Sequence, residues 1–283
     1  MKYAIIVFGQ YRSFSHNLET NLKEIKNSLL DGNDIDVYIV SDKCGNYSQK
    51  NTDKICNTFK KYNCNVKFIK LWENLNKYHE HEKDNKVSYD KNCKHRGGKH
   101  HFTSNLWYRR YVTNKIVNEY ISENDLKYDL HMFIRLFDIT IRKNVSDIDI
   151  KNRIKNCIEN NKLLMSIDTI FIGSKNIINK VFSFGKEFNL YHDDIWNNKD
   201  FCNYFQSIDY GLYRPRRNKR KPTYCSEVQI FSHIFYNIDL YENIRYDFNN
   251  PNNINNKLTL FHVKLCRHRK KKEYKSRYYN INK

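Results

Sequence analysis

Apolar residues occur along the chain in two patterns, which together predict alternating strands and helices. Near-continuous apolar runs predict buried strands at Tyr3–Phe8, Ile35–Val40, Val66–Leu71, within Asp129–Ile141 (strand, short turn, strand), at Leu163–Ile172 (with a break at Asp168) and at Leu258–Val263. Apolar positions at helical spacing predict helices at Leu18–Leu30, Lys54–Tyr62, Thr103–Ile121, Asp147–Glu159, Ser174–Phe184 (capped by Ser174) and Thr223–Phe235. This alternation predicts an α/β fold in which helices flank a mostly parallel central sheet.

The pattern lapses over residues 72–101, which are rich in Lys, His, Asn and Asp. A stretch of this length without periodicity is typical of a long loop or an insertion. The remainder of the 283 residues shows no internal repeat and no linker. We therefore expect a single domain over residues 1–263, with a variable insert at 72–101 and a basic tail at 264–283.

Composition excludes several classes of protein. The 22 Tyr and 17 Phe supply too much apolar area for a disordered chain, and the 8 Gly and 3 Pro exclude a collagen-like one. No apolar run approaches the roughly 18 residues of a membrane span, and the run after Met1 and Lys2 is too short for a signal peptide. The eight cysteines form no CxxC pair, which favours free thiols in a reducing compartment. We expect a soluble, cytoplasmic protein.

The chain is strongly basic, with 50 Lys and Arg against 31 Asp and Glu and a formal net charge of +19. A basic surface suits nucleic acid, an anionic membrane or a phosphate-bearing ligand. Lys and Asn are frequent throughout, as in proteins from AT-rich genomes, so local clusters are more informative than the total. The two densest clusters are Arg214–Lys221 and Arg267–Arg277, and tyrosines that could stack on bases are interleaved with the second. A solvated basic tail, or attraction to an anionic sugar donor or a membrane, is an equally open interpretation of both.

The first candidate binding residues follow the first predicted strand, at the end where open α/β sheets bind ligands. Gly9 permits close approach of the backbone, and Gln10 and Arg12 come directly after it. An arginine can bind a phosphate through two hydrogen bonds. The alternative is an ordinary turn with an exposed arginine, and neither a GxGxxG nor a Walker motif is present.

Polar residues also follow two later strands. Ser41 and Asp42 end the second strand, where an Asp can accept a hydrogen bond from a ribose or serve as a turn residue. Arg135 and Asp138 follow the apolar run that begins near Asp129. A carboxylate beside a cation suits a Mg²⁺ or Mn²⁺ ion that carries a diphosphate, and an ion pair that closes a turn is the alternative.

Three further residues could take part in chemistry. Asp168 interrupts an apolar stretch and therefore needs a hydrogen-bond partner or a ligand. Glu227 begins a predicted helix, where it could act as a general base or cap the helix. His262 ends the last predicted strand and could complete a metal site or lie in the core. The His and Cys residues between 79 and 101 match no common zinc-finger spacing.

The order of these motifs resembles that of a group of glycosyltransferase-like proteins found in bacteria and large DNA viruses. The resemblance covers about residues 1–240 and rests on the segments Tyr3–Phe14 (a strand, then Gly-Gln-x-Arg-x-Phe), Asp36–Asp42, Tyr128–Asp138, Asp168–Ser174 and Pro222–Glu227. The second Arg of the group's Arg-x-Arg-x-Asp segment is missing here, and no DxD motif is present. The AT-rich composition also looks like that of a giant-virus protein.

The resemblance implies a GT-A-like, Rossmann-type fold that binds a UDP- or GDP-sugar. It implies that Asp138 takes the place of the DxD motif and, with His262, holds Mn²⁺ or Mg²⁺. Glu227, or Asp168 as second choice, would deprotonate the acceptor hydroxyl. The residues expected to contact the donor are Gly9, Gln10, Arg12, Ser41, Asp42, Arg135 and Arg267.

These features together predict a hexosyl- or pentosyltransferase that moves a sugar from a nucleotide-sugar to a hydroxyl of a glycan or glycoprotein. The alternative is a non-catalytic, basic nucleic-acid-binding protein. The two differ in where their cations lie. A transferase mixes acidic and basic side chains at the strand ends, whereas a nucleic-acid module needs a continuous positive stripe.

Overall fold

The structure is a computed structural model of the whole chain, and it describes the chain in several stretches. These are residues 1–9, 14–42, 49–72, 101–137, 139–143, 145–166 and 169–187, with short pieces at 199–200, 230, 233–234, 241–243 and 261–265.

A seven-stranded sheet in the order β3-β2-β1-β4-β7-β6-β8 forms the centre of the fold. Its strands are β1 (Lys2–Val7), β2 (Asp34–Asp42), β3 (Cys64–Trp72), β4 (Leu130–Ile134), β6 (Leu163–Ser166), β7 (Ile170–Gly173) and β8 (Tyr241–Asn243). The first four are parallel, β7 runs antiparallel to both β4 and β6, and β8 is parallel to β6. The sheet is therefore mostly parallel, as the alternation of strands and helices predicted.

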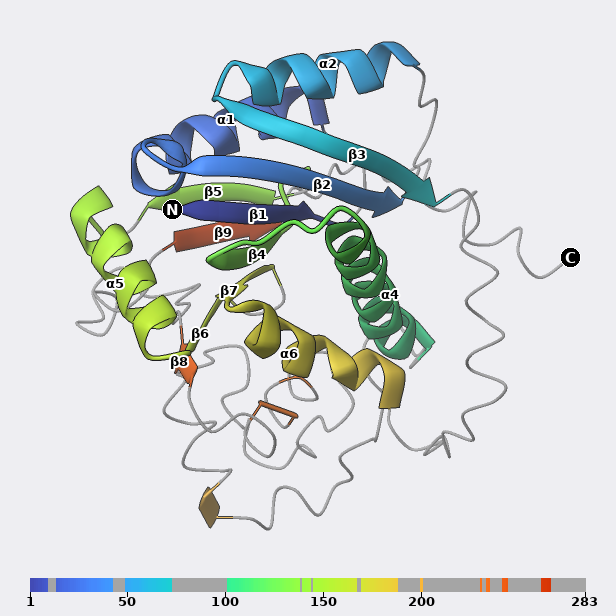
Figure 1. Cartoon of the computed structure of the whole chain (residues 1–283), viewed down its shortest axis with the longest axis vertical. Helices are drawn as coiled ribbons and strands as arrows, with labels where there is room; N and C mark the ends of the chain where they lie inside the picture. Colours follow the sequence, from blue (N-terminus) through green and yellow to red (C-terminus); the bar gives the residue numbers. More distant parts are fainter. Residues whose placement is uncertain are drawn as a thin grey trace, which may run out of the picture.

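The helices cover both faces of this sheet (Figure 1). They are α1 (Phe14–Ile25), which continues into a π-helical turn η1 (Lys26–Leu30), α2 (Gln49–Lys60), α4 (His101–Glu123), α5 (Asp147–Glu159) and α6 (Lys175–Glu187). Figure 1 shows α1 and α2 on one side of β1–β3, and α4 and α6 packed together on the other. Crossovers between parallel strands place the helices on both faces in this way, because the strand order reverses direction after β3.

Serine side chains cap the N-termini of α5 and α6. The Ser146 hydroxyl accepts a hydrogen bond from the Asp149 N–H at the start of α5, at 3.1 Å. The Ser174 hydroxyl accepts one from the Ile177 N–H at 3.3 Å, which confirms the predicted cap of α6. Each serine satisfies a backbone donor that the first helical turn leaves open.

Aromatic side chains fill the layer between the sheet and the pair α4 and α6. The Phe133 ring of β4 lies 4.4 Å from the Phe182 ring of α6, measured between centroids. The Trp107 ring of α4 lies 5.7 Å from that of Phe184. At Gly185 the two helices approach so closely that a Cβ would overlap the backbone carbonyl of Trp107. A glycine is therefore required at this crossing.

A second, two-stranded sheet pairs β5 (Ile139–Lys143) with β9 (Phe261–Leu265), and the two strands are antiparallel. The strands predicted within Asp129–Ile141 thus belong to different sheets, since β4 lies in the large sheet. The break predicted at Asp168 separates β6 from β7, which pair with each other. Most of the predicted helix 223–235, like the expected insert, lies outside the described residues.

The mixed α/β class and the mostly parallel, helix-flanked sheet are confirmed. The finer assignment to a GT-A-like fold and the single-domain boundary at 263 stay predictions. Within the described stretches, no helix combines the length and the apolar character needed to cross a membrane.

Candidate functional site at the carboxyl edge of the sheet

The strand order places a topological switch point between β1 and β4. The chain leaves β1 toward β2 on one side, and β4 enters on the other. In open α/β sheets such a switch point, at the carboxyl ends of the strands, is where ligands bind. We call this side of the sheet the carboxyl edge, and it includes Phe8, Gly9, Ser41, Arg135 and Thr169.

Gly9 forms the turn that leaves β1 at this edge. Its φ of 104° lies in the region that favours glycine. The Ser41 hydroxyl donates a hydrogen bond of 2.7 Å to the Gly9 carbonyl and thereby joins the ends of β1 and β2. Ser41 is buried and its proton is used in this bond. The observed role of Ser41 is therefore to hold the turn, and its contact with a donor stays a prediction.

Arg135 lies at the neighbouring strand end, beyond Ile134. Its N–H donates to the carbonyl of Thr169 at 3.1 Å, which ties the end of β4 to the start of β7. The Phe8 N–H donates to the Ile134 carbonyl at 3.2 Å, so β1 and β4 remain paired up to the edge. Gly9 and Arg135 thus stand on adjacent strand ends, whose axes are about 5 Å apart.

Two buried side-chain amides of α1 hold the segment between β4 and β5, which contains position 138. The Asn21 Nδ2 donates to the carbonyls of Leu136 at 3.0 Å and Ile139 at 2.8 Å, and its Oδ1 accepts from the Ile141 N–H at 2.8 Å. The Asn17 Nδ2 donates to the Phe137 carbonyl at 3.2 Å. These amides satisfy backbone groups that neither sheet pairs, and they fix the chain around the predicted metal ligand.

Arg110 of α4 lies beneath the same edge. It is only 1% exposed, and its guanidinium carbon lies 4.1 Å from the Trp107 ring centroid and 5.2 Å from that of Phe8. Sequence reasoning missed this residue. The available signal was its phase, because position 110 falls on the apolar stripe that Leu106 and Val117 define.

Several residues of the predicted site are not described. Outside the described residues lie Gln10, Arg12, Asp138, Asp168, Glu227 and Arg267, together with the side chains of Asp42 and His262. Their roles stay predictions. The backbone of Asp42 ends β2 at the carboxyl edge, as expected.

The register of the small sheet determines how far the backbone of His262 lies from position 138. Ile139, which directly follows position 138, is paired with Leu265, whereas His262 is paired with Arg142. The backbone of His262 is therefore three residues, or about 10 Å, from the strand end next to position 138. An ion shared by His262 and Asp138 stays a prediction.

No cluster of three or more His, Cys, Asp or Glu side chains within the described stretches could hold a metal ion. Asp138 and the side chain of His262 lie outside these stretches. The expected Mn²⁺ or Mg²⁺ therefore stays a prediction.

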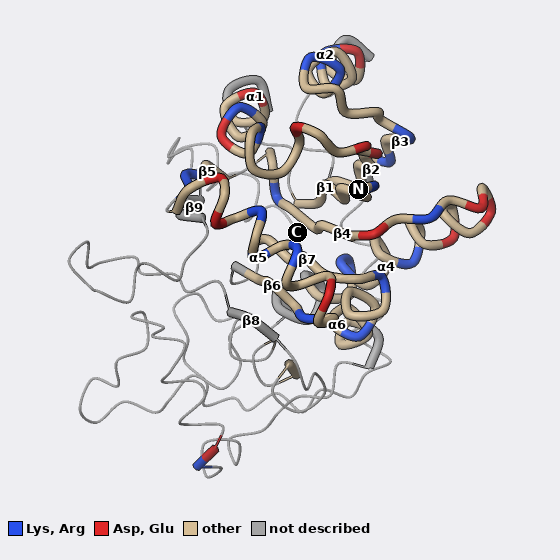
Figure 2. The backbone as a smooth tube through the Cα atoms, turned by 60° about the vertical axis from the view of Figure 1, so that its left-hand side comes forward, with Lys and Arg blue, Asp and Glu red and all other residues tan. Residues whose placement is uncertain are grey.

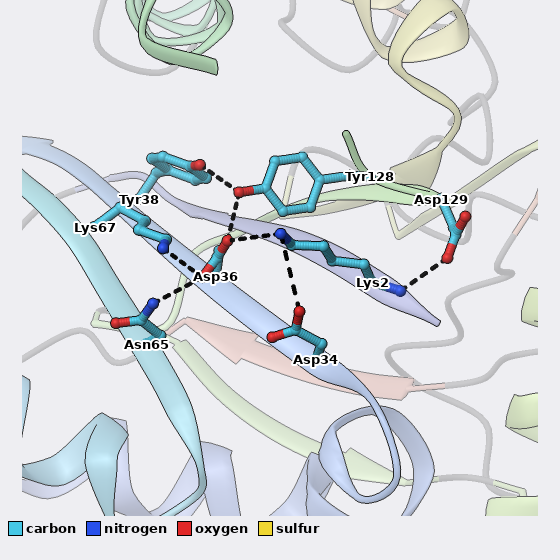
Figure 3. A network of polar contacts seen from close by, with 8 residues as sticks. All are labelled: Lys2, Asp34, Asp36, Tyr38, Asn65, Lys67, Tyr128 and Asp129. Carbon is cyan, nitrogen blue, oxygen red and sulfur yellow. Dashed lines mark hydrogen bonds and ion pairs between the residues drawn. The ribbon is translucent and has the colours of Figure 1, made fainter. Parts of the chain in front are cut away.

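A second polar cluster lies at the opposite edge, where the parallel strands begin (Figure 3). Asp36, which is 2% exposed, accepts hydrogen bonds from the Tyr128 hydroxyl at 2.6 Å and the Asn65 Nδ2 at 3.0 Å. The ammonium groups of Lys67 and Lys2 lie 3.3 and 3.8 Å from the same carboxylate. Asp36 is thus surrounded by donors and cations from three neighbouring segments.

The hydroxyl chain of this cluster extends to Tyr38, whose Oη lies 2.6 Å from that of Tyr128. Burial raises the pKa of Tyr38 to about 12, and burial together with the bond to Asp36 also raises the pKa of Tyr128. Both hydroxyls therefore stay protonated near neutral pH. The cluster is polar but internally satisfied, so we interpret it as a structural link between β1, β2 and β3.

Acidic and basic side chains are interspersed along the described helices (Figure 2). Pairs such as Lys115–Glu119 on α4 and Lys155–Glu159 on α5 stand one helical turn apart. The two basic clusters of the sequence, Arg214–Lys221 and Arg267–Arg277, lie outside the described residues.

Comparison with known proteins adds no assignment. No model of a known protein family matches the chain, and no curated protein matches it. The class that the fold defines is an α/β protein with a mostly parallel sheet whose strand order changes direction between β1 and β4.

Proposed function

We propose that the protein is a glycosyltransferase that uses a nucleotide-sugar donor bound at the carboxyl edge. The observation that carries the proposal is the convergence of Gly9, Ser41 and Arg135 at the β1–β4 switch point. Open α/β sheets bind their ligands at this place. The motif order along residues 1–240 supports a GT-A-like transferase in particular.

The proposed chemistry requires the charge of a departing nucleoside diphosphate to be offset. As the sugar leaves, negative charge grows on the diphosphate, and fixed cations stabilise that state more than the ground state. Arg135 directly follows β4, and Arg12 and Arg267 are its expected partners. A divalent ion held by Asp138 and His262 would supply further positive charge to the same phosphates.

The acceptor side of the reaction needs a base. Glu227 is our first candidate to take the proton of the attacking hydroxyl, and Asp168 is the second. The flanks of Asp168, Ser166 and Thr169, lie at the carboxyl edge because β6 ends and β7 begins there. We propose residues 72–101 as the part that binds the glycan or glycoprotein acceptor, and the cytoplasm as the location.

The direct test is hydrolysis of nucleotide-sugars by the purified protein with Mn²⁺. We expect one UDP- or GDP-sugar to raise the melting temperature and to be hydrolysed slowly. Asp138→Ala should lower the hydrolysis rate by roughly a hundredfold, because it removes charge stabilisation at the diphosphate. The matched control is Asp31→Ala, which changes an exposed carboxylate on the turn before β2.

Equal hydrolysis rates for Asp138→Ala and the parent would reject the metal assignment. Stabilisation by a single-stranded oligonucleotide alone, with no response to any nucleotide-sugar, would instead favour the nucleic-acid-binding alternative.

A further inference from the structure

The ends of β2 and β3 reach farther toward the carboxyl edge than the ends of the parallel strands β1 and β4. β1 is paired with β2 as far as Val7 and Ile39, and β4 ends opposite Val7, at Ile134. β2 and β3 remain paired for three more positions, as far as Asp42 and Trp72. Figure 1 accordingly shows the arrowheads of β2 and β3 side by side, beyond that of β1. The backbones of Asp42 and Trp72 are therefore neighbours, about 5 Å apart, at the outermost described position of this edge.

The alternation of residues along a strand assigns both positions to the face of the sheet that α4 covers. Tyr38 and Phe68 are register partners, and their ring centroids lie 5.7 and 5.1 Å from that of Tyr120 in α4. Asp42 follows Tyr38 by four positions, Trp72 follows Phe68 by four, and the pairing is regular in between. Because every second residue of a strand belongs to the same face, Asp42 and Trp72 share the α4 face.

The end of β3 is accessible from solvent. Lys70, two residues before Trp72 and on the same face, is exposed, and Leu71 on the opposite face is only half-buried. By contrast, every residue of β1 from Tyr3 to Val7 is buried. β3 is also the outermost strand of the described sheet on this side. A ligand can therefore approach the end of β3 directly from solvent.

The two residue types suit the two parts of a nucleoside. The indole of a tryptophan is a large planar apolar surface, and nucleobases of every kind stack on such a surface. A carboxylate accepts hydrogen bonds from hydroxyl groups, and an acidic residue in dinucleotide-binding α/β folds binds ribose in this way. A tryptophan and an aspartate in register thus combine recognition of a base with recognition of the sugar attached to it.

The order of the strands matches the order of the groups in a nucleoside diphosphate. Across the sheet, β3 with Trp72 is followed by β2 with Asp42, then by β1 with Gly9 after it, and then by β4 with Arg135 after it. Neighbouring strands are about 5 Å apart, so the four positions span roughly 15 Å. A nucleoside diphosphate likewise extends from base through ribose to two phosphates. A diphosphate bound at the β1–β4 switch point therefore directs its ribose toward β2 and its base toward β3.

We propose that the carboxyl ends of β3 and β2 bind the nucleoside of the donor, with Trp72 stacking on the base and Asp42 accepting a hydrogen bond from the ribose. This inference rests on the proposed function and extends it from the diphosphate to the nucleoside. Trp72 contacts the base alone, so it contributes to the affinity for UDP or GDP and not to that for inorganic pyrophosphate.

Calorimetric titration of the full-length protein with UDP, GDP and inorganic pyrophosphate, in the presence of Mg²⁺, tests this assignment. We expect Trp72→Ala to weaken binding of the preferred nucleoside diphosphate about tenfold, because a stacked base is lost. Pyrophosphate binding should stay within twofold of the parent. Trp72→Phe keeps an aromatic ring and should recover most of the loss. The control is Tyr62→Ala, which removes an aromatic ring just before the opposite end of β3 and should leave both affinities within twofold.

A folded Trp72→Ala variant that binds UDP and GDP within twofold of the parent would overturn the inference. Equal losses for nucleoside diphosphate and pyrophosphate would also overturn it, because they would show that Trp72 supports the sheet edge rather than the base.

If Trp72→Ala does not fold, the intrinsic fluorescence of the parent and of Trp72→Phe decides. The nucleoside diphosphate should quench the emission of the parent and leave that of Trp72→Phe nearly unchanged, since stacking on the base quenches the indole of Trp72. Equal quenching in the two proteins, or none in the parent, would reject the stacking.

A base of single-stranded nucleic acid has the same stacking chemistry, and competition separates the two sources. At about 200 mM salt, where electrostatic binding is weakened, a single-stranded oligonucleotide should not displace UDP or GDP. Displacement would overturn the assignment to a donor in favour of a nucleic-acid base.

The inference and the proposed function can fail separately. Hydrolysis of a nucleotide-sugar by a protein whose UDP and GDP affinities are indifferent to Trp72 removes only the stacking residue. A parent protein that binds neither a nucleoside diphosphate nor any nucleotide-sugar removes the proposed function together with the inference.

Discussion

Asn21 shows how a single buried side chain can determine the geometry of a strand end. Its amide makes three hydrogen bonds to the backbone of residues 136–141, all between 2.8 and 3.0 Å. The periodicity of the sequence places Asn21 on the buried side of a helix, beside Leu22. It does not say which carbonyls the amide meets, because those carbonyls lie more than a hundred residues away along the chain.

Replacing Asn21 tests this role. Asn21→Ala should lower the free energy of unfolding by about 2–4 kcal/mol, because it leaves two carbonyls and one N–H buried without partners. Denaturant unfolding measures the change. Asn124→Ala is the control, since the exposed Asn124 amide donates a local hydrogen bond to the Tyr120 carbonyl one turn earlier, and it should change stability by less than about 0.5 kcal/mol. Similar losses in both variants would contradict the assigned role.

His131 of β4 predicts a pH dependence of stability. Burial, with a smaller contribution from the nearby Lys175 charge, lowers the pKa of His131 to about 4. The unfolded chain has the ordinary value of about 6.5. Above pH 6.5 the imidazole is neutral in both states. As the pH falls from 6.5 toward 4, only the unfolded state takes up the proton, so this contribution to stability is progressively lost.

The comparison with His131→Leu isolates this contribution. Between pH 6.5 and 5 the parent should lose roughly 1.5 kcal/mol more stability than the variant. Denaturant unfolding at several pH values gives the two curves. Parallel curves over this interval would mean that His131 is protonated in the folded protein as readily as in the unfolded chain.

The close packing of α4 against α6 depends on the absence of a side chain at Gly185. A Cβ at Gly185 would overlap the Trp107 carbonyl and lie 2.8 Å from the Cβ of Tyr111. The amides of Asn114 and Asn118 both donate to the Asn179 Oδ1 at 2.8 Å farther along the same contact. The close approach at Gly185 and the hydrogen bonds to Asn179 together fix how the two helices are aligned.

We expect Gly185→Ala to destabilise the protein by about 2–3 kcal/mol, because the clash involves backbone and cannot be relieved by a rotamer change. The higher helix propensity of alanine, worth about 1 kcal/mol, offsets only part of this. Thermal and denaturant unfolding provide the measurement. Ser183→Ala on the same helix removes only an exposed local hydrogen bond and should be nearly neutral. A stabilised Gly185→Ala variant would show that the helices are farther apart than described.

At the scale of elements, the sequence predicted well what depends on local pattern. Asp147–Glu159 is α5 with the predicted bounds, and Ser174 caps α6. Which strands pair with each other could not be predicted from local pattern. The chain between β4 and β5 is short, yet β5 pairs with β9 more than a hundred residues later. Neither the run of apolar residues in β5 nor that in β9 specifies a partner, because strands of similar composition are interchangeable as neighbours.

At the scale of the whole molecule, the net charge of +19 predicts salt-sensitive binding to polyanions. Affinity for a single-stranded oligonucleotide should fall at least tenfold between about 50 and 200 mM salt, because such binding releases counterions. Stabilisation by a nucleotide-sugar should change much less, since a donor carries only one diphosphate. Fluorescence anisotropy and thermal shift at several salt concentrations test this. Oligonucleotide binding that is insensitive to salt would indicate base contacts and a nucleic-acid function.

The sequence by itself determined the α/β class, the order of the elements from β1 to α6 and the strand-end positions of Gly9, Ser41 and Arg135, because these follow from local periodicity and from the edge that parallel strands share. Only the tertiary structure decided that β1 and β4 are neighbours, that Asn21 holds the segment around position 138 and that Arg110 lies behind the carboxyl edge. Those relations join residues far apart in the chain, and they arise from packing against a common core rather than from any local preference.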